Sequence, residues 1–408
     1  MKKLLKEIIK LSDKKGIRKQ QAFEIFVNER VDHIINRKPL NNFDVLYLNA
    51  VNANPFVDVL EQVAVELGYF NNRLGQFMTP ASVSAYLTLK SAHQEALDFS
   101  CGTGVNGLVM LAKMQASHTL VLDGKSQPII NIGFGRKALT LHLNDLDEMM
   151  CKVAFIQVLA NYNMHCKNSF NLDLLITNNN VITEWESDLN IVYKSNVSKQ
   201  DFTRLCDAKK DLLLLNPPYG LKDYGLSYAK QNQHQKRFSE HLPKKNDCES
   251  AFIQSAMELM TDKGECFLIL PMNVNFSEKC YYVRKKILDD NLLDTSIALP
   301  AKLFSETSIP TTAWHLNKQR KKQAVYMLKL DKELQFFKKH TAISIFEGYK
   351  TINVSTKNAK SINISDLRHK VESLTDSKMV ELNRRVLEHL KTPTAHINDG
   401  NLVDQKRA

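Results

Sequence analysis

The stretch best suited to chemistry is Asn216-Pro217-Pro218-Tyr219, which follows a short apolar run at residues 211–215. An aspartate and four leucines predict a buried parallel strand that stops at the prolines, because proline lacks a backbone donor. The first proline keeps Asn216 out of the helical region, so its side chain and the Pro217 carbonyl are expected to face one place. They offer two acceptors to one amino group, and Tyr219 offers a flat ring for stacking. A strand followed by an ordinary Pro-Pro turn is the alternative.

A second candidate site is the glycine turn in EALDFSCGTGVNGLVMLAK, residues 95–113. Gly102, Gly104 and Gly107 fit the spacing G-x-G-x-x-G between a predicted strand and a predicted helix. Glycines at this spacing let backbone N–H groups approach a ligand at the helix start. The spacing fits nicotinamide, flavin and S-adenosylmethionine alike, and a helix start with incidental glycines is the alternative.

An acid at the end of the second strand commonly accepts hydrogen bonds from ribose hydroxyls, and two strands compete for that position. TLVLD ends at Asp123, and ALTLHLND ends at Asp145. We prefer Asp145, because an apolar-faced helix continues from it, and residues 123–135 then become an insertion or hairpin. Asn168 is expected at the end of a third strand, where its side chain would reach a ligand's base.

The remaining pattern predicts the elements that position these motifs. Residues 1–70 carry helical apolar stripes and predict a small helical domain, and Thr79-Pro80 predicts a helix start. Alternating residues around an NNN triplet predict a hairpin within 171–210. The polar stretch 221–247 predicts either a mobile loop over the site or a disordered segment. The strands TSIALPAKLF and TTAWHLNK are expected to complete the sheet as an antiparallel pair, and a C-terminal amphipathic helix is expected within 367–390.

Composition describes an ordinary globular chain with a basic excess. The 408 residues include 55 Lys and Arg against 44 Asp and Glu, a net charge of +11, which favours a polyanion or an acidic surface as partner. The seven cysteines form no C-x-x-C pair, so neither a zinc site nor a disulfide framework is indicated, and a reducing cytoplasmic location is expected. Lysines interrupt the N-terminal apolar residues, so we expect no signal peptide, and no run is long enough to span a membrane.

Taken in order, the motifs GQFMTP, DFSCGTG, NDLD, NPPYG, KGECFLILP and LPAKLFSETSIPTTAWHLNK resemble those of amino-group DNA methyltransferases that make N6-methyladenine. The chain is most similar to the modification (methylase) subunit of type I restriction-modification systems, over residues 75–318. The resemblance implies an α/β fold with a doubly wound, mainly parallel sheet. It also implies a helical N-terminal domain, expected at 1–70, and a catalytic domain, expected at 71–320. The remaining residues, 321–408, are expected to form a C-terminal extension with the amphipathic helix.

The resemblance also implies which residues bind the cofactor S-adenosylmethionine and the target. Asn216, Pro217, Pro218 and Tyr219 would hold the target adenine. The residues that would line the cofactor are Gln76, Phe77, Thr79, Pro80, Asp98, Cys101, Gly102, Gly104, Asp145 and Asn168. Asn168 stands where the family usually has an acid that reads the cofactor's adenine.

The implied reaction needs no metal and acts on double-stranded DNA. The target base is flipped out and stacked on Tyr219, and Asn216 and the Pro217 carbonyl accept hydrogen bonds from its amino group. Because 90 residues follow position 318, which is short for a target-recognition domain, a separate specificity subunit is expected.

Three other functions share parts of this pattern. A methyltransferase acting on a protein glutamine or on an RNA amino group would also use an NPPY turn. A nicotinamide-dependent oxidoreductase would use the same glycines with Asp123, but would leave NPPYG without a role. A non-catalytic DNA-binding subunit could keep the fold, although the intact NPPY argues against it.

Overall fold

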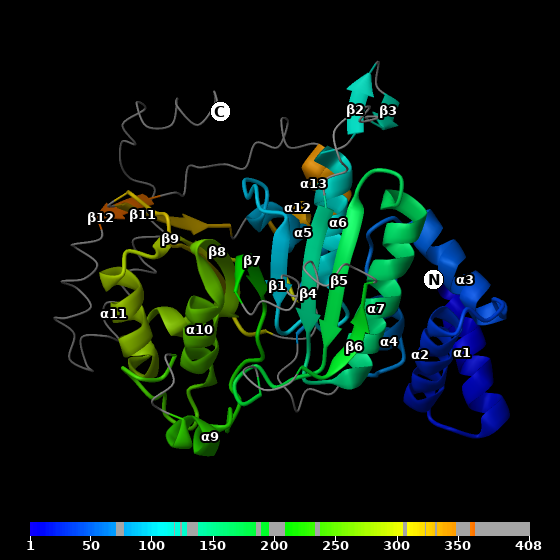
Figure 1. Ribbon diagram of the computed structural model, residues 1–408, viewed down its shortest axis with the longest axis horizontal. Coiled ribbons are helices and arrows are strands. Elements are labelled where there is room, and N and C mark those ends of the chain that lie inside the picture. The colour runs from blue at the N-terminus through cyan, green and yellow to red at the C-terminus, as the bar shows by residue number, and fades with distance from the viewer. Residues whose placement is uncertain are drawn as a thin grey trace.

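The computed structural model describes residues 1–70, 77–117, 119–122, 125–128, 138–184, 189–195, 209–232, 237–304, 308–322, 324–330, 333–347 and 360–363. The described part contains one ten-stranded sheet with helices on both faces (Figure 1). The strands of this sheet are β1 (Glu95–Asp98), β4 (Ala138–Asn144), β5 (Asn171–Thr177), β6 (Ile191–Lys194), β7 (Lys210–Leu215), β8 (Met260–Pro271), β9 (Leu293–Ala298), β10 (Thr311–Asn317), β11 (Ala324–Lys329) and β12 (Lys360–Asn363).

The sheet is parallel at its centre and mixed toward its edges. The strand order is β12-β11-β9-β10-β8-β7-β1-β4-β5-β6. Neighbours from β8 through β7, β1 and β4 to β5 are parallel, whereas β6 and β10 run antiparallel to their neighbours. The doubly wound, mainly parallel sheet expected from the sequence is confirmed.

Side chains alternate between two apolar layers, one on each face of the sheet. In β7, Leu212 and Leu214 join the larger layer, and Leu213 and Leu215 join the smaller one, as the two-residue strand period requires. The helices of the larger layer are α1 (Lys2–Lys15), α2 (Lys19–Ile35), α3 (Asn42–Ala53), α4 (Val59–Glu66), α5 (Ala81–Leu87), α6 (Val105–Ser117), α7 (Glu148–Asn161), α12 (Leu334–Lys339) and α13 (Ala342–Glu347). Those of the smaller layer are α9 (Leu226–Gln231), α10 (Cys248–Leu259) and α11 (Tyr281–Asp289).

The N-terminal helices share a core with the sheet domain. Figure 1 shows α1 to α3 beyond the β6 end of the sheet, and α2, α3 and α4 contact α7. The Phe56 N–H donates to Asn161 Oδ1 of α7 at 2.7 Å. The helical character expected for residues 1–70 is confirmed, and the domain boundary at residue 70 stays a prediction.

The hairpin of β2 (Thr119–Leu122) and β3 (Lys125–Pro128) forms a separate two-stranded sheet. Strand β4, and not TLVLD, therefore pairs with β1 as the second strand of the central sheet, and Asp145 follows it. The predicted position of Asp145, at the end of the second strand, is confirmed. Asp123 lies outside the described residues.

Two expectations about the later part of the chain need correction. The sheet does not end with β10, because β11 pairs parallel to β9 and carries β12 beyond it. The sequence AVYMLK of β11 is apolar except for its lysine, but the basic residues that flank it obscured the strand. Stretch 221–247 is also more than a polar loop, because it contains α9 and the buried Tyr224 and Phe238. The helix expected within 367–390 lies outside the described residues.

Among the described residues, no helix combines the length and the apolar character needed to cross a bilayer.

Candidate active site

Polar side chains collect where the central parallel strands end. Asp98 ends β1, Asp145 follows β4, Asn179 follows β5 and Asn216 follows β7. Since these strands are parallel neighbours, their carboxyl ends meet at one edge of the sheet, where open α/β sheets bind ligands. All four side chains line one pocket.

The glycine turn between β1 and α6 forms one wall of this pocket. Gly102 and Gly104 have φ angles of +50° and +91°, which residues with a Cβ rarely adopt. A Cβ on Gly104 would lie 2.9 Å from Cα of Ala154, so glycine here lets the turn approach α7 closely. The Gly102 N–H donates to the Asp145 carboxylate at 2.8 Å, which joins the turn to the end of β4.

Two buried acids give the pocket its electrostatic character. Burial raises the pKa of Asp98 to about 7, although Asn106 and the Ser100 backbone donate hydrogen bonds to it. Burial raises the pKa of Asp145 to about 6, and this carboxylate accepts N–H groups from Gly102 and Asp147. Each acid would be stabilised in its ionised form by a nearby positive charge. The pocket therefore suits a cationic ligand.

Hydrogen bonds fix the orientation of the Asn216 side chain. Its Nδ2 donates to the Phe77 carbonyl at 2.7 Å and to Thr79 Oγ1 at 2.9 Å. Its Oδ1 accepts from the Tyr219 hydroxyl at 2.5 Å. Because Nδ2 faces two acceptors and Oδ1 faces a donor, the network assigns the two ends of the amide. The carbonyl oxygen of Asn216 is thus held as an acceptor at the pocket.

Tyr219 packs inward in this structure. Its side chain is only 7% exposed, and its ring centroid lies 5.4 Å from that of Phe77 with the planes tilted by 39°. The hydroxyl supports Asn216, as described above. Stacking of Tyr219 on a flat ligand would require its ring to turn away from Phe77, so the predicted stacking role stays a prediction.

Most residues predicted from the sequence come together at this pocket. Those that line it are Phe77, Thr79, Asp98, Cys101, Gly102, Asp145, Asn216 and Pro218. Gly104, Pro80, Pro217 and Tyr219 are not among the lining residues; Gly104 shapes the turn, and Pro80 occupies the N-cap position of α5 without a side-chain capping bond. Gln76 lies outside the described residues.

The expectation that Asn168 ends a strand is wrong. Asn168 is exposed and precedes β5, whose first residue is Asn171, so it lies at the opposite edge of the sheet from the pocket. A π-helical turn, Tyr162–Cys166, prolongs α7 and delays the strand by several residues. Asn179 and Asn180, from the NNN triplet that follows β5, line the pocket instead.

Other functional positions were missed at the level of sequence. Leu146 directly follows Asp145, lines the pocket and is 63% exposed, so it offers an apolar face to a planar ring. Asn106 donates to both Asp98 Oδ2 and the Leu214 carbonyl, and so joins β1 to β7. The position of Leu146 could have been found from the sequence, because it directly follows the acid at the end of a strand. The hydrogen bond from Asn106 to Leu214 could not, because the two residues lie far apart in the chain.

In the part of the chain that the structure describes, no three His, Cys, Asp or Glu side chains gather as a set of metal ligands.

Comparison with known proteins places the chain in a family. The family model for N-6 DNA Methylase matches residues 56–385. A type I restriction enzyme MpnII methylase subunit of Mycoplasma pneumoniae is 25% identical over 338 residues, covering 77% of this chain and 56% of that protein. A type I restriction enzyme MjaVIII methylase subunit of Methanocaldococcus jannaschii is 24% identical over 308 residues, covering 72% of this chain and 45% of that protein.

A solved structure supports the fold. A Listeria monocytogenes protein assigned to the class I S-adenosylmethionine-dependent methyltransferases superposes with a TM-score of 0.52 and 14% identity, covering 82% of this chain and 97% of that one. The chain spans about half the length of the two methylase subunits it matches. Because the family model covers more than half of the sequence, the chain belongs to the N-6 DNA methylase family.

Proposed function

We propose that the protein transfers a methyl group from S-adenosylmethionine to the N6 amino group of adenine in DNA, as part of a restriction-modification system. The observation that carries this proposal is the Asn216 side chain, held as an acceptor in the same pocket as the acids Asp98 and Asp145. One side of the pocket thus suits a cationic cofactor, and the other suits an amino group.

The residues around the glycine turn fit S-adenosylmethionine. This cofactor is positively charged and supplies an electrophilic methyl group on sulfur. Asp98 and Asp145 are buried acids whose ionised forms a cation would stabilise. Asp145 would accept hydrogen bonds from the ribose, Leu146 would cover a face of the adenine ring, and Phe77 and Thr79 would border the methionine end.

Asn216 would prepare the amino group for attack. Its Nδ2 is committed to Phe77 and Thr79, so only Oδ1 is presented to a substrate. An amino group that donated to Oδ1 and to the Pro217 carbonyl would keep its lone pair out of ring conjugation. The nitrogen could then bond to the methyl carbon as the carbon–sulfur bond breaks, and the N–H proton lost afterwards would pass to water. Most of the rate would come from positioning, since the residues supply little other chemistry.

Target binding would change the surroundings of Asn216. The Tyr219 hydroxyl occupies one acceptor position on Oδ1 in this structure, and the ring lies against Phe77. A flipped-out adenine would displace the tyrosine ring and take it as a stacking partner, at an unstacking cost of a few kcal/mol for the duplex.

We propose double-stranded DNA as the macromolecular partner, together with a separate specificity subunit. The net charge of +11 favours a polyanion, and the lysines of α1 (Lys2, Lys3, Lys6, Lys10, Lys14 and Lys15) are all exposed. A DNA substrate suits a cytoplasmic enzyme, and so do the six cysteines of the described residues, which are all free thiols.

The test is labelled methyl transfer from S-adenosylmethionine to genomic DNA, total RNA and cell protein, followed by nucleoside mass spectrometry. We expect N6-methyladenine in DNA. Asn216→Ala should abolish it while leaving cofactor affinity within about twofold, because Asn216 acts on the substrate. Label in RNA or protein, with none in DNA, would refute the proposal. Cofactor binding without any label calls for repeating the assay with a specificity subunit added.

A further inference from the structure

A buried carboxylate joins the N-terminal helices to the glycine turn. Asp58 precedes α4 and caps it, because its carboxylate accepts the Glu61 N–H at 2.9 Å. Serine or asparagine would cap a helix equally well. Asp58 is only 7% exposed, and a buried charge costs free energy unless it is paired or hydrogen-bonded. Capping alone therefore does not account for an acid at this position.

The same carboxylate reaches two other segments. Its Oδ2 accepts the Thr103 hydroxyl of the glycine turn, and its Oδ1 accepts Gln157 Nε2 of α7 at 2.6 Å. Gln157 Nε2 also donates to the Thr103 carbonyl at 2.8 Å, and Gln157 Oε1 accepts the Leu60 N–H at 3.0 Å. Helix α4, the glycine turn and helix α7 thus share one buried hydrogen-bond network.

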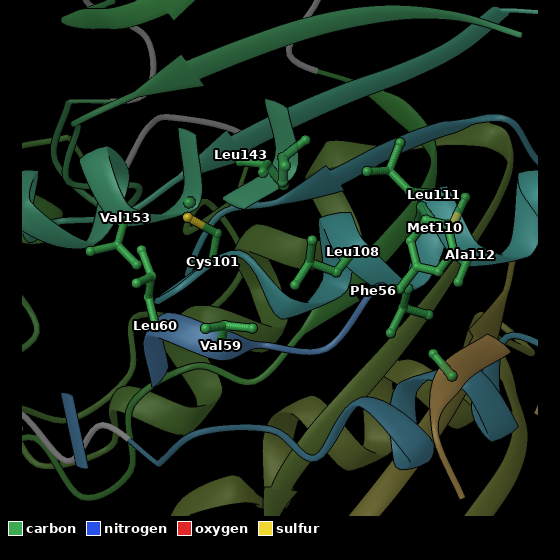
Figure 2. Close-up of a cluster of buried hydrophobic side chains, with 14 of the residues drawn as sticks. Phe56, Val59, Leu60, Cys101, Leu108, Met110, Leu111, Ala112, Leu143 and Val153 are labelled. Carbon is green, nitrogen blue, oxygen red and sulfur yellow. The ribbon is translucent and has the colours of Figure 1, made fainter. Parts of the chain in front are cut away.

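Apolar packing surrounds this network. Figure 2 shows Val59 and Leu60 of α4 near Cys101 of the turn and Val153 of α7, and all four belong to one buried cluster. The hydrogen-bond network is therefore shielded from water. In such a buried environment each hydrogen bond is stronger, and the loss of a partner costs more free energy.

Thr103 is the residue of the glycine turn that links Asp58 to the pocket, and it is itself one of the residues that line the pocket. It lies between Gly102 and Gly104, which have no Cβ and therefore give the turn access to other backbone conformations. The Gly102 N–H in turn donates to Asp145, the acid proposed to bind ribose. Holding Thr103 therefore holds Gly102 against Asp145.

We propose that Asp58 is a positioning residue, which fixes the glycine turn through Thr103 and so couples the N-terminal helices to cofactor affinity. This inference rests on the proposed use of S-adenosylmethionine at the pocket. Residue 58 acts through Thr103 and contacts no reacting atom.

The test compares variants by calorimetric titration with S-adenosylmethionine. Asp58→Ser keeps a helix cap but is too short to reach Thr103 and Gln157, and we expect about tenfold weaker binding. Thr103→Val removes the other end of the bridge and should weaken binding to a similar extent. The double variant should bind about as well as Asp58→Ser alone, because Asp58→Ser has already broken the bond to Thr103 that Thr103→Val removes.

Asp58→Asn is the conservative variant. Its Oδ1 can still accept Glu61 N–H and Gln157 Nε2, and its Nδ2 can donate to Thr103 Oγ1. The Thr103 hydroxyl can then turn to Met78 Sδ, 3.9 Å away. We expect cofactor affinity within about twofold of the wild type. If the negative charge of Asp58 were itself required, Asp58→Asn would weaken binding as much as Asp58→Ser.

Asn41→Ala is the matched control for general weakening of the N-terminal helices. Asn41 caps α3 through the Asp44 N–H and belongs to none of the bonds described above. It should lower stability to urea without changing cofactor affinity. Wild-type affinity in both Asp58→Ser and Thr103→Val, or equal weakening in Asn41→Ala, would overturn the proposal. A wild-type protein that binds no S-adenosylmethionine would overturn the proposed function as well, and the two failures are thus distinguishable.

Discussion

The buried acid Asp98 should make cofactor binding depend on pH. Burial raises its pKa from 3.8 to about 7, so in the free protein it is half protonated near neutral pH. A cationic cofactor binds the ionised form, and at low pH binding must first remove the proton. We therefore expect the affinity for S-adenosylmethionine to fall as the pH is lowered from 8 to 6.

The size of the effect follows from the pKa. Protonation of a carboxyl group with a pKa of about 7 weakens binding by the factor 1 + 10^(7 − pH). This factor is about 11 at pH 6 and about 1.1 at pH 8. The expected change is about tenfold. Burial raises the pKa of Asp145 to about 6, which adds about a further twofold at pH 6. Proton release from Asp98 on binding should be about 0.9 at pH 6 and about 0.1 at pH 8.

Calorimetric titration in buffers of different ionisation enthalpy measures both the affinity and the released protons. The control is Asp98→Asn, which cannot ionise, and the amino group of the cofactor titrates equally with both proteins. The difference between the two pH profiles therefore belongs to residue 98. Parallel profiles for wild type and variant, with equal proton release, would refute this reasoning.

Two further substitutions test the shape of the pocket. Gly104→Ala should lower the free energy of unfolding by roughly 2–4 kcal/mol, because it combines a positive φ with a Cβ placed 2.9 Å from Ala154. Gly16→Ala, with φ +62° and open space around it, should cost about 1 kcal/mol in the same urea titration, and equal losses would contradict the packing argument. Leu146→Ala should weaken cofactor binding about fivefold without changing stability, because the side chain is 63% exposed at the pocket. Ile35→Ala, which removes another exposed apolar side chain, should leave binding unchanged, and a similar loss there would argue against a role of Leu146.

The parts of the site that sequence predicted are those with local causes. The strand that ends just before Asn216 follows from a leucine run and two prolines, which act on neighbouring residues alone. The choice of Asp145 followed from the helix directly after it. Gly102 and Gly104, the two glycines of this turn that have positive φ angles, were likewise marked by their spacing.

The parts that sequence did not predict depend on residues far apart in the chain. Asn168 was misplaced because a π-helical turn after α7 shifts the start of β5, and nothing in the local pattern marks such a turn. The inward position of Tyr219 depends on Phe77, and the bridge from Asp58 to Thr103 joins residues 45 positions apart. Short-range periodicity contains no information about such pairs.

Strands β1 and β7 are direct neighbours, with Leu97 paired to Leu213. The cofactor side of the pocket is built at the end of one strand and the acceptor Asn216 at the end of the other. Adjacent strands lie about 4.8 Å apart, a spacing set by backbone hydrogen bonds. The gap that a transferred methyl group would have to cross is therefore set by the main chain. Substitutions in segments around the pocket, such as 221–232, would leave this strand spacing unchanged.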